Sequence, residues 1–376
     1  MGRLRVLHIG KFYPPHMGGI ETHLQTLCER LTNIDLQVLV ANDGRDSIEE
    51  VVSGVRVNRL ATQFAVKSAS YCPELVAKIR STPADIVHLH LPNPTGTIAY
   101  LQSRHPGKLV VTYHSDVVKQ RILGSLFEPI LQTALRKASA ILATSPDYLR
   151  SSASLQPHKS RCHVVPYGIP LDSFSQPDPA KVASIRQLFG NRLMIAVGRL
   201  VYYKGFEYAI RAMRSIDARL LIAGTGPLKT ALEQEIRDCG VQDKVVLLGN
   251  IDNSEIAPYY HASKLFAFPS IARSEAFGIV QLEAMMAGLP VVNTSLDSGV
   301  PFVSQHGVTG LTVPPMDADA FANAANTILN DDVLHARFSQ AARNRVVSEF
   351  AAERMVTRTL SIYEQVTAPA AYKLAA

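Results

Sequence analysis

The chain of 376 residues contains no tryptophan and only four cysteines, which are scattered without a Cys-x-x-Cys pair. This pattern predicts reduced, structural thiols in a cytoplasmic protein. A zinc site would need clustered ligands, and none stand together in the sequence. No apolar run reaches the roughly 18–20 residues that a membrane span requires. The start, MGRLRVLHIG, is basic, but its apolar run is too short for a signal peptide and predicts a first strand instead.

The net charge of +6 is unevenly distributed along the chain. Residues 1–170 carry 19 lysines and arginines against 12 acidic residues, whereas the remainder carries 19 against 20. Such a surplus favours nucleic acid, anionic lipid or a phosphorylated substrate as partner. Nucleic acid is disfavoured, because no zinc-finger spacing or basic strand interleaved with aromatic residues accompanies the charge. The amphipathic stretch 117–138 predicts either a membrane-surface helix or a core-packed helix pair with a basic outer side.

Short apolar, β-branched runs alternate with segments of helical period along the whole chain. Runs of this kind are typical of strands covered on both faces, so helices between them predict doubly wound parallel sheets. The stretch 166–179 is rich in proline, glycine and aspartate, and after it the pattern begins again. The sequence therefore predicts an α/β fold of two Rossmann-like halves, with ligands bound at the carboxyl ends of the strands.

The first chemical motif is a pair of glutamates, Glu275 and Glu283, that follows a predicted strand at 265–268. Free amides of residues 277–280 at a helix N-terminus would attract phosphate or sugar hydroxyls. Eight helical residues rise about 12 Å, whereas the carboxyls of a retaining glycosidase stand about 5–5.5 Å apart. The pair therefore indicates two separate hydrogen-bond acceptors on one long ligand. A capping acid followed by a solvated helix acid explains the spacing equally well.

The second motif is the segment 198–205, GRLVYYKG, between a predicted strand and a predicted helix. It places Arg199 and Lys204 beside a helix N-terminus, where two cations suit a diphosphate and could neutralise a leaving nucleotide. An ordinary basic loop is the alternative.

Three weaker motifs complete the set. Gly18 and Gly19 follow the first strand and allow a ligand to approach the backbone, although no dinucleotide fingerprint is present. Asp317 and Asp319 form an Asp-x-Asp pattern, but their place before a helix predicts an N-cap and not a metal site. His114, at the carboxyl end of a strand, suits either a tight turn or a ligand contact.

Two further histidines, His88 and His90, alternate along one predicted strand. We expect His88 to be packed within the fold and His90 to lie nearer the mouth of the following loop.

Together these motifs resemble the retaining glycosyltransferases of family 4, whose two-domain fold is called GT-B. The most specific segments are SEAFGIVQLEAMMAGLPVV and GRLVYYKG, and the segments PPHMGGIE, VVPYGIPLDSF and HGVTGLTVPP support them. The resemblance spans nearly the whole chain. It implies two Rossmann-like doubly wound domains facing a central cleft, with a C-terminal helix that crosses back to the N-terminal domain. Residues 1–168, with about 355–376, would bind the acceptor, and residues 169–354 would bind a nucleotide-sugar donor.

The resemblance also implies roles for single residues. Arg199 and Lys204 would bind the donor diphosphate, while Glu275 would hold hydroxyls of the transferred sugar and His114 would approach that sugar. Glu283 would bind the ribose, and loss of Lys204 or Glu275 would nearly abolish transfer with the fold intact. The remaining donor contacts implied are Gly18, Gly19, Gly198, Asn250, Ile251, Phe277, Gly278, Ile279 and Val280. No metal and no cofactor are expected, because the nucleotide-sugar is a substrate.

Two departures from the family pattern concern the donor. Phe302 occupies a place that is acidic in many relatives, and the last helix lacks the tryptophan often found at its start. Neither position touches the implied phosphate or sugar contacts.

The runs YHSDVVKQ and NTSLDSGVPFVSQHGVTGLTVPP are similar to bacterial enzymes of surface-polysaccharide assembly. Many of those use GDP-mannose and a polyprenyl-diphosphate-linked acceptor, which implies a cytoplasmic protein peripheral to the inner face of the membrane. A UDP-sugar donor and a non-catalytic nucleotide-sugar-binding protein stay as alternatives. A sugar-nucleotide epimerase is disfavoured by the two glutamates, and an NAD oxidoreductase by the missing fingerprint.

Overall fold

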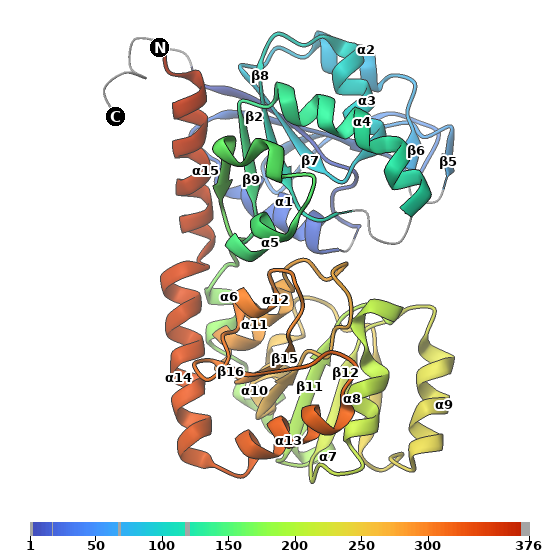
Figure 1. Cartoon of the computed structure of the whole chain (residues 1–376), viewed down its shortest axis with the longest axis vertical. Helices are drawn as coiled ribbons and strands as arrows, with labels where there is room; N and C mark the ends of the chain where they lie inside the picture. The colour runs from blue at the N-terminus through green and yellow to red at the C-terminus, as the bar shows by residue number, and fades with distance from the viewer. Residues whose placement is uncertain (1–2, 17, 67–68, 117–120, 370–376) are drawn as a thin grey trace. The chain divides into compact units, whose positions relative to one another are not determined.

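The computed structural model describes residues 3–16, 18–66, 69–116 and 121–369. The chain divides into two compact units, an N-terminal unit of Met1–Gly168 with Ala352–Ala376 and a C-terminal unit of Ile169–Ala351. Each unit contains a largely or wholly parallel sheet with helices on both of its faces (Figure 1). The predicted α/β fold of two Rossmann-like halves is therefore confirmed.

The sheet of the N-terminal unit has the strand order β10-β9-β8-β7-β1-β2-β4-β3. All its neighbours are parallel except β3 and β4, which form an antiparallel pair at the edge. Its central strands are buried along their length, as the apolar runs predicted. The strands are β1 Arg5–Ile9, β2 Asp35–Ala41, β3 Ile48–Val52, β4 Val55–Leu60, β7 Ile86–Leu91, β8 Lys108–Tyr113, β9 Ala140–Ala143 and β10 Cys162–Val164; β5 Phe64–Val66 and β6 Ala69–Tyr71 form a separate hairpin.

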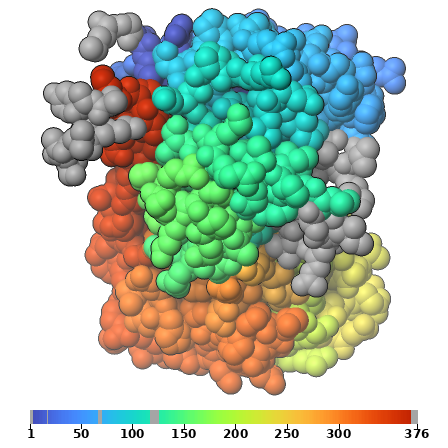
Figure 2. Space-filling view, turned by 45° about the horizontal axis from the view of Figure 1, so that its top comes forward, coloured from blue at the N-terminus to red at the C-terminus, as the bar shows by residue number. Residues whose placement is uncertain are grey.

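One face of this sheet is covered by α1 and by the last helix of the chain, α15. Val6, Ile86 and Val110 of the sheet pack there against Leu27 of α1 and Tyr363 of α15. The last helix therefore returns to the N-terminal unit, as expected, and Figure 2 shows its red surface beside the blue surface of the first residues. The helices of the unit are α1 Gly19–Arg30, α2 Leu75–Ser81, α3 Pro94–Ser103, α4 Arg121–Lys137, α5 Pro146–Ser151, the 3-10 helix η1 Gln156–Arg161 and α15 Ala352–Thr367.

The amphipathic stretch 117–138 is only partly described. Residues 117–120 lie outside the described part of the chain, and α4 occupies most of the remainder. Throughout the described ranges, no helix combines the length and the apolar character that crossing a membrane would need.

The sheet of the C-terminal unit is parallel throughout, with the order β13-β12-β11-β14-β15-β16. The chain builds outwards from β11 to β13, then returns to the other side of β11 with β14. In sheets of this kind, ligands bind beyond the carboxyl ends of the strands at such a reversal, which here lies at β11 and β14. The strands are β11 Leu193–Val197, β12 Arg219–Ala223, β13 Val245–Gly249, β14 Leu265–Ala267, β15 Val291–Thr294 and β16 Gly310–Val313.

The helices of the C-terminal unit pack on both faces of this sheet, and Phe206, Ile210 and Phe321 lie in its main core. The helices are α6 Asp172–Ser175, α7 Pro179–Phe189, the 3-10 helix η2 Tyr202–Lys204, α8 Phe206–Ala212, α9 Lys229–Cys239, α10 Ala257–Ala262, α11 Ile279–Met286, α12 Val300–Val303, α13 Ala318–Leu329 and α14 Asp332–Glu349.

Candidate active site

The loops that follow β11 and β14 are packed against each other at the carboxyl edge of the C-terminal sheet. The amide of Ile271 donates a hydrogen bond to the carbonyl oxygen of Tyr203 at 2.8 Å. Gly205 has a φ of 62°, and a Cβ atom at this position would lie 2.2 Å from the carbonyl oxygen of Pro269. Only glycine permits both this backbone conformation and this close approach. The loop of the GRLVYYKG motif is thereby fixed to the loop that leads to the two glutamates.

The centre of this edge is an ion pair between Lys204 and Glu275. The Nζ atom of Lys204 lies 2.6 Å from Oε2 of Glu275, and the two side chains are 11% and 10% exposed. The hydroxyl of Ser270 donates to the same carboxylate oxygen at 3.2 Å. The ammonium also lies 5.1 Å from the centroid of the Phe268 ring, within range of a cation–π contact. The structure therefore joins residues that the sequence analysis assigned to separate motifs.

Gly198 and Arg199 flank this pair at the end of β11. A Cβ atom at Gly198 would lie 3.0 Å from Cε of Lys204, so the missing side chain leaves room for the lysine stem. Arg199 is exposed. Burial raises the pKa of the neighbouring Tyr203 hydroxyl, and the positive charges of Lys204 and Arg199 oppose that rise. Lys204 and Arg199 therefore both contribute positive charge near Tyr203.

The helix α11 begins directly beside this region, without any side chain capping its N-terminus. Gly278 precedes the helix with a φ of 78°, and a Cβ atom there would lie 2.5 Å from Cζ of Phe268. Phe277 is buried, and Ile279 and Val280 form the first turn. The first turn of a helix presents backbone N–H groups and a positive dipole end, which together attract anions.

The predicted separation of the two glutamates rested on a wrong assumption. Helix α11 covers only residues 279–286, so Glu275 lies on the loop before it and a rise of 1.5 Å per residue does not measure the distance to Glu283. The physical reason is the left-handed backbone of Gly278, which ends the loop and starts the helix.

Glu283 lies within α11, and its Oε2 accepts a hydrogen bond from the hydroxyl of Tyr260 at 2.8 Å. Burial raises the pKa of this carboxyl, while the Tyr260 hydrogen bond and the positive charge of Lys204 lower it. Lys204 thus acts electrostatically on both glutamates. Asn250 and Ile251, the predicted nucleobase contacts, follow β13 at the same edge of the sheet and are exposed and partly exposed, respectively.

The remaining predicted residues lie in the N-terminal unit. Gly18 is the N-cap of α1 in an extended conformation, and Gly19 is the first residue of that helix. His114 is 1% exposed. Its Nε2 atom lies 3.1 Å from Nδ1 of His90, and its Nδ1 atom hydrogen-bonds to the hydroxyl of Tyr167.

Two expectations about the other histidines can be compared with this arrangement. His88 is fully buried and hydrogen-bonded to Thr112 and Tyr363, as expected. His90 is next to the last residue of β7 and lies nearer the following loop than His88, as expected, but it is also buried, at 1% exposed. Helix α1 supplies the reason, because His23 of this helix lies beside the His90 ring.

Side chains that could hold a metal ion lie together in the fold, although the sequence shows no zinc-type spacing. Five buried histidines lie together in the N-terminal unit, namely His8, His23, His88, His90 and His114. They come from four segments of the chain, and His88 and His90 share one of them. The proximity of the other three depends on strand order and on the packing of α1, so it could not be seen as a spacing. The Asp-x-Asp pattern is an N-cap, as predicted, since the side chain of Asp317 accepts from the amide of Ala320 at 2.8 Å.

Comparisons with known proteins agree with this architecture. A family profile described as "Glycosyl transferases group 1" matches residues 184–345, and one described as "Glycosyltransferase Family 4" matches residues 17–173. D-rhamnosyltransferase WbpZ of Pseudomonas aeruginosa is 32% identical over 326 residues, which cover 85% of each chain. The chain belongs to glycosyltransferase family 4. It is therefore a glycosyltransferase, with the region around Lys204 and Glu275 inside the first profile.

Other relatives match along nearly the full length of this family 4 glycosyltransferase. O-antigen chain mannosyltransferase C of Escherichia coli is 29% identical over 366 residues, covering 96% of this chain and 98% of that protein. A GDP-mannose-dependent alpha-(1-6)-phosphatidylinositol monomannoside mannosyltransferase of Mycobacterium tuberculosis is 27% identical over 371 residues, covering 92% and 94%. Sucrose-phosphate synthase from Thermosynechococcus elongatus has the same GT-B fold, with a TM-score of 0.84 at 24% identity over 97% of this chain and 99% of that one.

Proposed function

We propose that this glycosyltransferase moves mannose from GDP-mannose, with retention of configuration and without a metal ion, onto a saccharide acceptor of cell-surface polysaccharide synthesis. The acceptor is proposed to be a saccharide linked to a polyprenyl diphosphate. The names of the full-length relatives support mannose as the sugar and GDP as the nucleotide. The observation that carries the proposal is the buried pair of Lys204 and Glu275 beside the uncapped start of α11.

The proposed donor lies across the carboxyl edge of the C-terminal sheet. Arg199 and Lys204 bind its diphosphate together with the first amides of α11, since cations and helix N-termini both stabilise phosphate. Glu275 accepts hydrogen bonds from hydroxyls of the mannose. Glu283 accepts from the ribose, and the nucleobase lies near Asn250.

Charge that develops on the leaving diphosphate is the main quantity this site would stabilise. In the proposed front-face route, the bond between the sugar and the diphosphate breaks while the leaving diphosphate takes the proton of the acceptor hydroxyl. The acceptor oxygen then bonds to the anomeric carbon on the face that the diphosphate leaves, which retains the configuration. Donors already oriented towards the developing charge contribute about 10²–10³ each to the rate of comparable reactions.

The acceptor and the membrane are proposed partners of the N-terminal unit. The basic surplus of residues 1–170 suits both a lipid-linked diphosphate and the anionic inner face of a membrane. We therefore propose a cytoplasmic protein that associates peripherally with that face.

A thermal-shift panel of GDP-, UDP- and ADP-sugars tests the donor, because a ligand that binds the folded state stabilises it. GDP-mannose should raise the melting temperature most and should be consumed only when a lipid-linked saccharide is added. Proton NMR of the product should show the anomeric configuration of the donor, and added Mg²⁺ or Mn²⁺ should leave the rate unchanged. Stabilisation by a UDP-sugar alone would replace the donor, and binding without turnover would favour a non-catalytic binding protein.

A further inference from the structure

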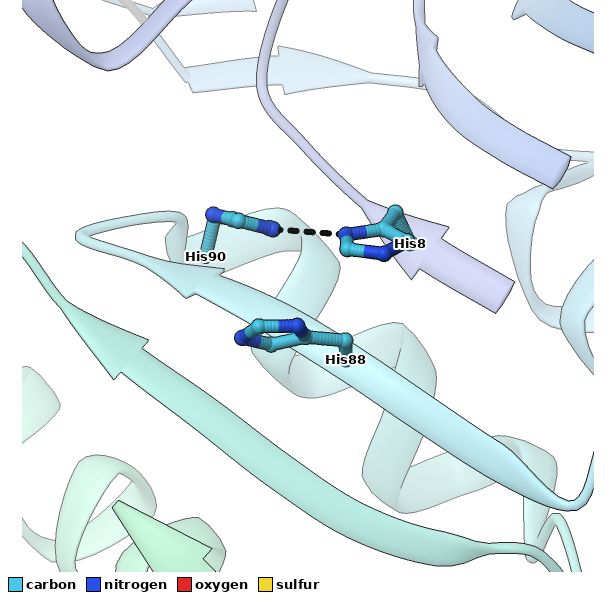
Figure 3. A group of neighbouring side chains, drawn as sticks. All are labelled: His8, His88 and His90. Carbon is cyan, nitrogen blue, oxygen red and sulfur yellow. Dashed lines mark hydrogen bonds between the residues drawn. The ribbon is translucent and has the colours of Figure 1, made fainter. Parts of the chain in front are cut away.

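The five histidines of the N-terminal unit lie on the sheet face that α1 and α15 cover. His8 of β1 is in register with His88 of β7, and His90 follows two residues later on the same face. Figure 3 shows the rings of His8 and His90 turned towards each other, with His88 below them in the view, on the same strand as His90. His114 follows β8, and His23 belongs to α1. All five are at most 3% exposed.

Hydrogen bonds connect four of these rings in one chain. Nδ1 of His8 lies 3.0 Å from Nε2 of His90, and Nδ1 of His90 lies 3.1 Å from Nε2 of His114. At the other end, the hydroxyl of Tyr363 lies 3.3 Å from Nε2 of His8 and 2.5 Å from Nδ1 of His88. Each ring of this chain therefore has a partner at both nitrogens.

His23 differs from the other four, because neither of its buried ring nitrogens has a hydrogen-bond partner among the residues that the structure describes. Its ring centroid lies 5.1 Å from that of His114 and 5.9 Å from that of His90. A buried polar atom without a partner costs about 1–3 kcal/mol, so a ligand for His23 is called for at this point. The rings of His90 and His114 cannot supply this hydrogen bond, because both nitrogens of each ring are already hydrogen-bonded.

We propose that His23, His90 and His114 bind a divalent transition-metal ion, with Zn²⁺ as the best match. One nitrogen from each ring lies within 4.8 Å of the others. Two nitrogens bound to tetrahedral zinc at about 2.0–2.1 Å stand about 3.3 Å apart. The facing nitrogens of His90 and His114 stand 3.1 Å apart, close to that separation, so both can bind one ion once the two rings turn their lone pairs towards it.

The charge state of the cluster suits a metal ion. All three rings are at most 3% exposed. Burial favours the neutral form of imidazole, which is the form that ligates metals. Three neutral imidazoles are an established zinc ligand set.

The hydrogen-bond chain can release the necessary lone pairs without loss of a proton. His90 would bind the metal through Nδ1 and carry its proton on Nε2, donating to Nδ1 of His8. His8 would in turn donate from Nε2 to the Tyr363 oxygen. His114 would bind through Nε2 and donate from Nδ1 to the oxygen of Tyr167. Metal-ligating histidines are commonly oriented by a hydrogen bond at the other ring nitrogen, and both partners are in place here.

The proposed ion would join three segments that are distant in the sequence: helix α1, strand β7 and the loop after β8. Such an ion would stabilise the N-terminal unit, because metal binding is coupled to folding. This inference departs from the expectation of no metal in the protein. It concerns a different unit from the Lys204–Glu275 pair, and it does not rest on the proposed donor or reaction.

The test uses the full chain, stripped with a chelator and titrated with Co²⁺ and then Zn²⁺. We expect the wild type to bind one Co²⁺ with a visible absorption band that Zn²⁺ abolishes. The His23→Ala variant should bind Zn²⁺ more than about 100-fold more weakly, since loss of a mere hydrogen-bond partner of a ligand already weakens binding roughly 10–100-fold. His163→Ala is the matched control, because His163 lies on β10 of the same unit and outside the cluster. This variant should bind Zn²⁺ as the wild type does.

Three outcomes would overturn the assignment. The first is a wild type that binds no Co²⁺ or Zn²⁺, and the second is a folded His23→Ala variant that binds as the wild type does. The third is loss of binding in His88→Gln with retention in His23→Ala, which would place the ion among His8, His88 and His90 instead. Imidazole ¹⁵N NMR of the wild type provides a readout without any variant, since three histidine resonances should shift on addition of Zn²⁺.

Discussion

Replacement of Lys204 by methionine tests whether the ion pair at the candidate active site is a structural element as well as a catalytic one. The substitution keeps the length of the side chain and removes its charge. The carboxylate of Glu275, which is 10% exposed, would then lose the positive charge beside it and keep the hydrogen bond from Ser270. From the sequence, loss of Lys204 was expected to leave the fold intact. The buried pair indicates that stability falls as well.

The magnitude follows from the burial of the pair. Removal of one partner of a buried ion pair costs about 3–5 kcal/mol, because the other charge stays buried without compensation. For a unit of this size the corresponding fall in melting temperature is roughly 6–20 °C. The double variant Lys204→Met/Glu275→Gln removes the orphaned charge and should recover at least about 1 kcal/mol of the loss. Transfer should fall by at least about 10²–10³ in both variants, since neither supplies the cation.

The assay combines urea unfolding, followed by circular dichroism, with a transfer assay on protein shown to be folded. Lys181→Met is the matched control. Lys181 pairs with Glu255 at 2.5 Å, but these side chains are 48% and 50% exposed, so its loss should cost within about 1 kcal/mol. Equal losses of stability for Lys204→Met and Lys181→Met would refute the reasoning, as would a double variant less stable than Lys204→Met alone.

Three further predictions follow from the structure. In urea unfolding, Gly205→Ala should destabilise the protein by about 1–3 kcal/mol more than Gly240→Ala. Both glycines have a positive φ, but only at Gly205 would the added Cβ atom clash, with the backbone of Pro269. Equal losses of stability would contradict the packing of the two loops. Stability should fall as the pH falls from 6.5 towards 3, because the unfolded His23 takes up a proton below its ordinary pKa of 6.5 while burial holds the folded pKa at about 3. That ring alone should account for about 2 kcal/mol between pH 7 and pH 5, so urea unfolding of His23→Phe should show a smaller fall than the wild type, and an unchanged fall would count against it. Glu283→Gln should weaken GDP binding by about 1.5–3 kcal/mol in calorimetry without loss of the fold, and unaltered affinity would remove Glu283 from the proposed site.

Much of the fold could be predicted from the sequence because its central strands are buried on both faces. Runs such as 193–197 and 220–223 are uniformly apolar and stand out against the helical segments around them. The edge strand β3 and its neighbour β4 were missed. Residues 48–52 are largely exposed and carry two glutamates, so no apolar run marks them. A strand at the edge of a sheet has less surface to bury, which weakens the signal on which such predictions depend.

The candidate active site was predictable as a set of loops but not as a set of contacts. Parallel strands end at one edge, so motifs that follow such strands are expected near one another. The direct contact of Lys204 with Glu275 depends on β11 lying beside β14, two strands that are not consecutive in the chain. Strand order of this kind is set by packing of the whole unit, and periodicity within one segment does not contain it.

The histidine cluster could have been found in part. A period of two places His88 and His90 on one face of their strand, and His8 occupies the fourth position of a neighbouring buried strand. Once β1 and β7 are taken as neighbours, three imidazoles must share a buried face. The position of His23 could not be inferred in this way, since it depends on how α1 packs across the sheet.

Both clusters lie where the strand order of a sheet reverses, at β1 and β7 in one unit and at β11 and β14 in the other. The physical demands on the two differ. Lys204 and Glu275 carry charges that compensate each other, so a diphosphate can compete for the lysine only if it replaces that compensation. The imidazoles are neutral, and protonation of any one would place an uncompensated charge among the others. A metal ion would also bring positive charge, but its bonds to three nitrogens would compensate for that. The histidine cluster is therefore suited to hold a cation permanently, and the Lys204–Glu275 pair to exchange an anionic ligand.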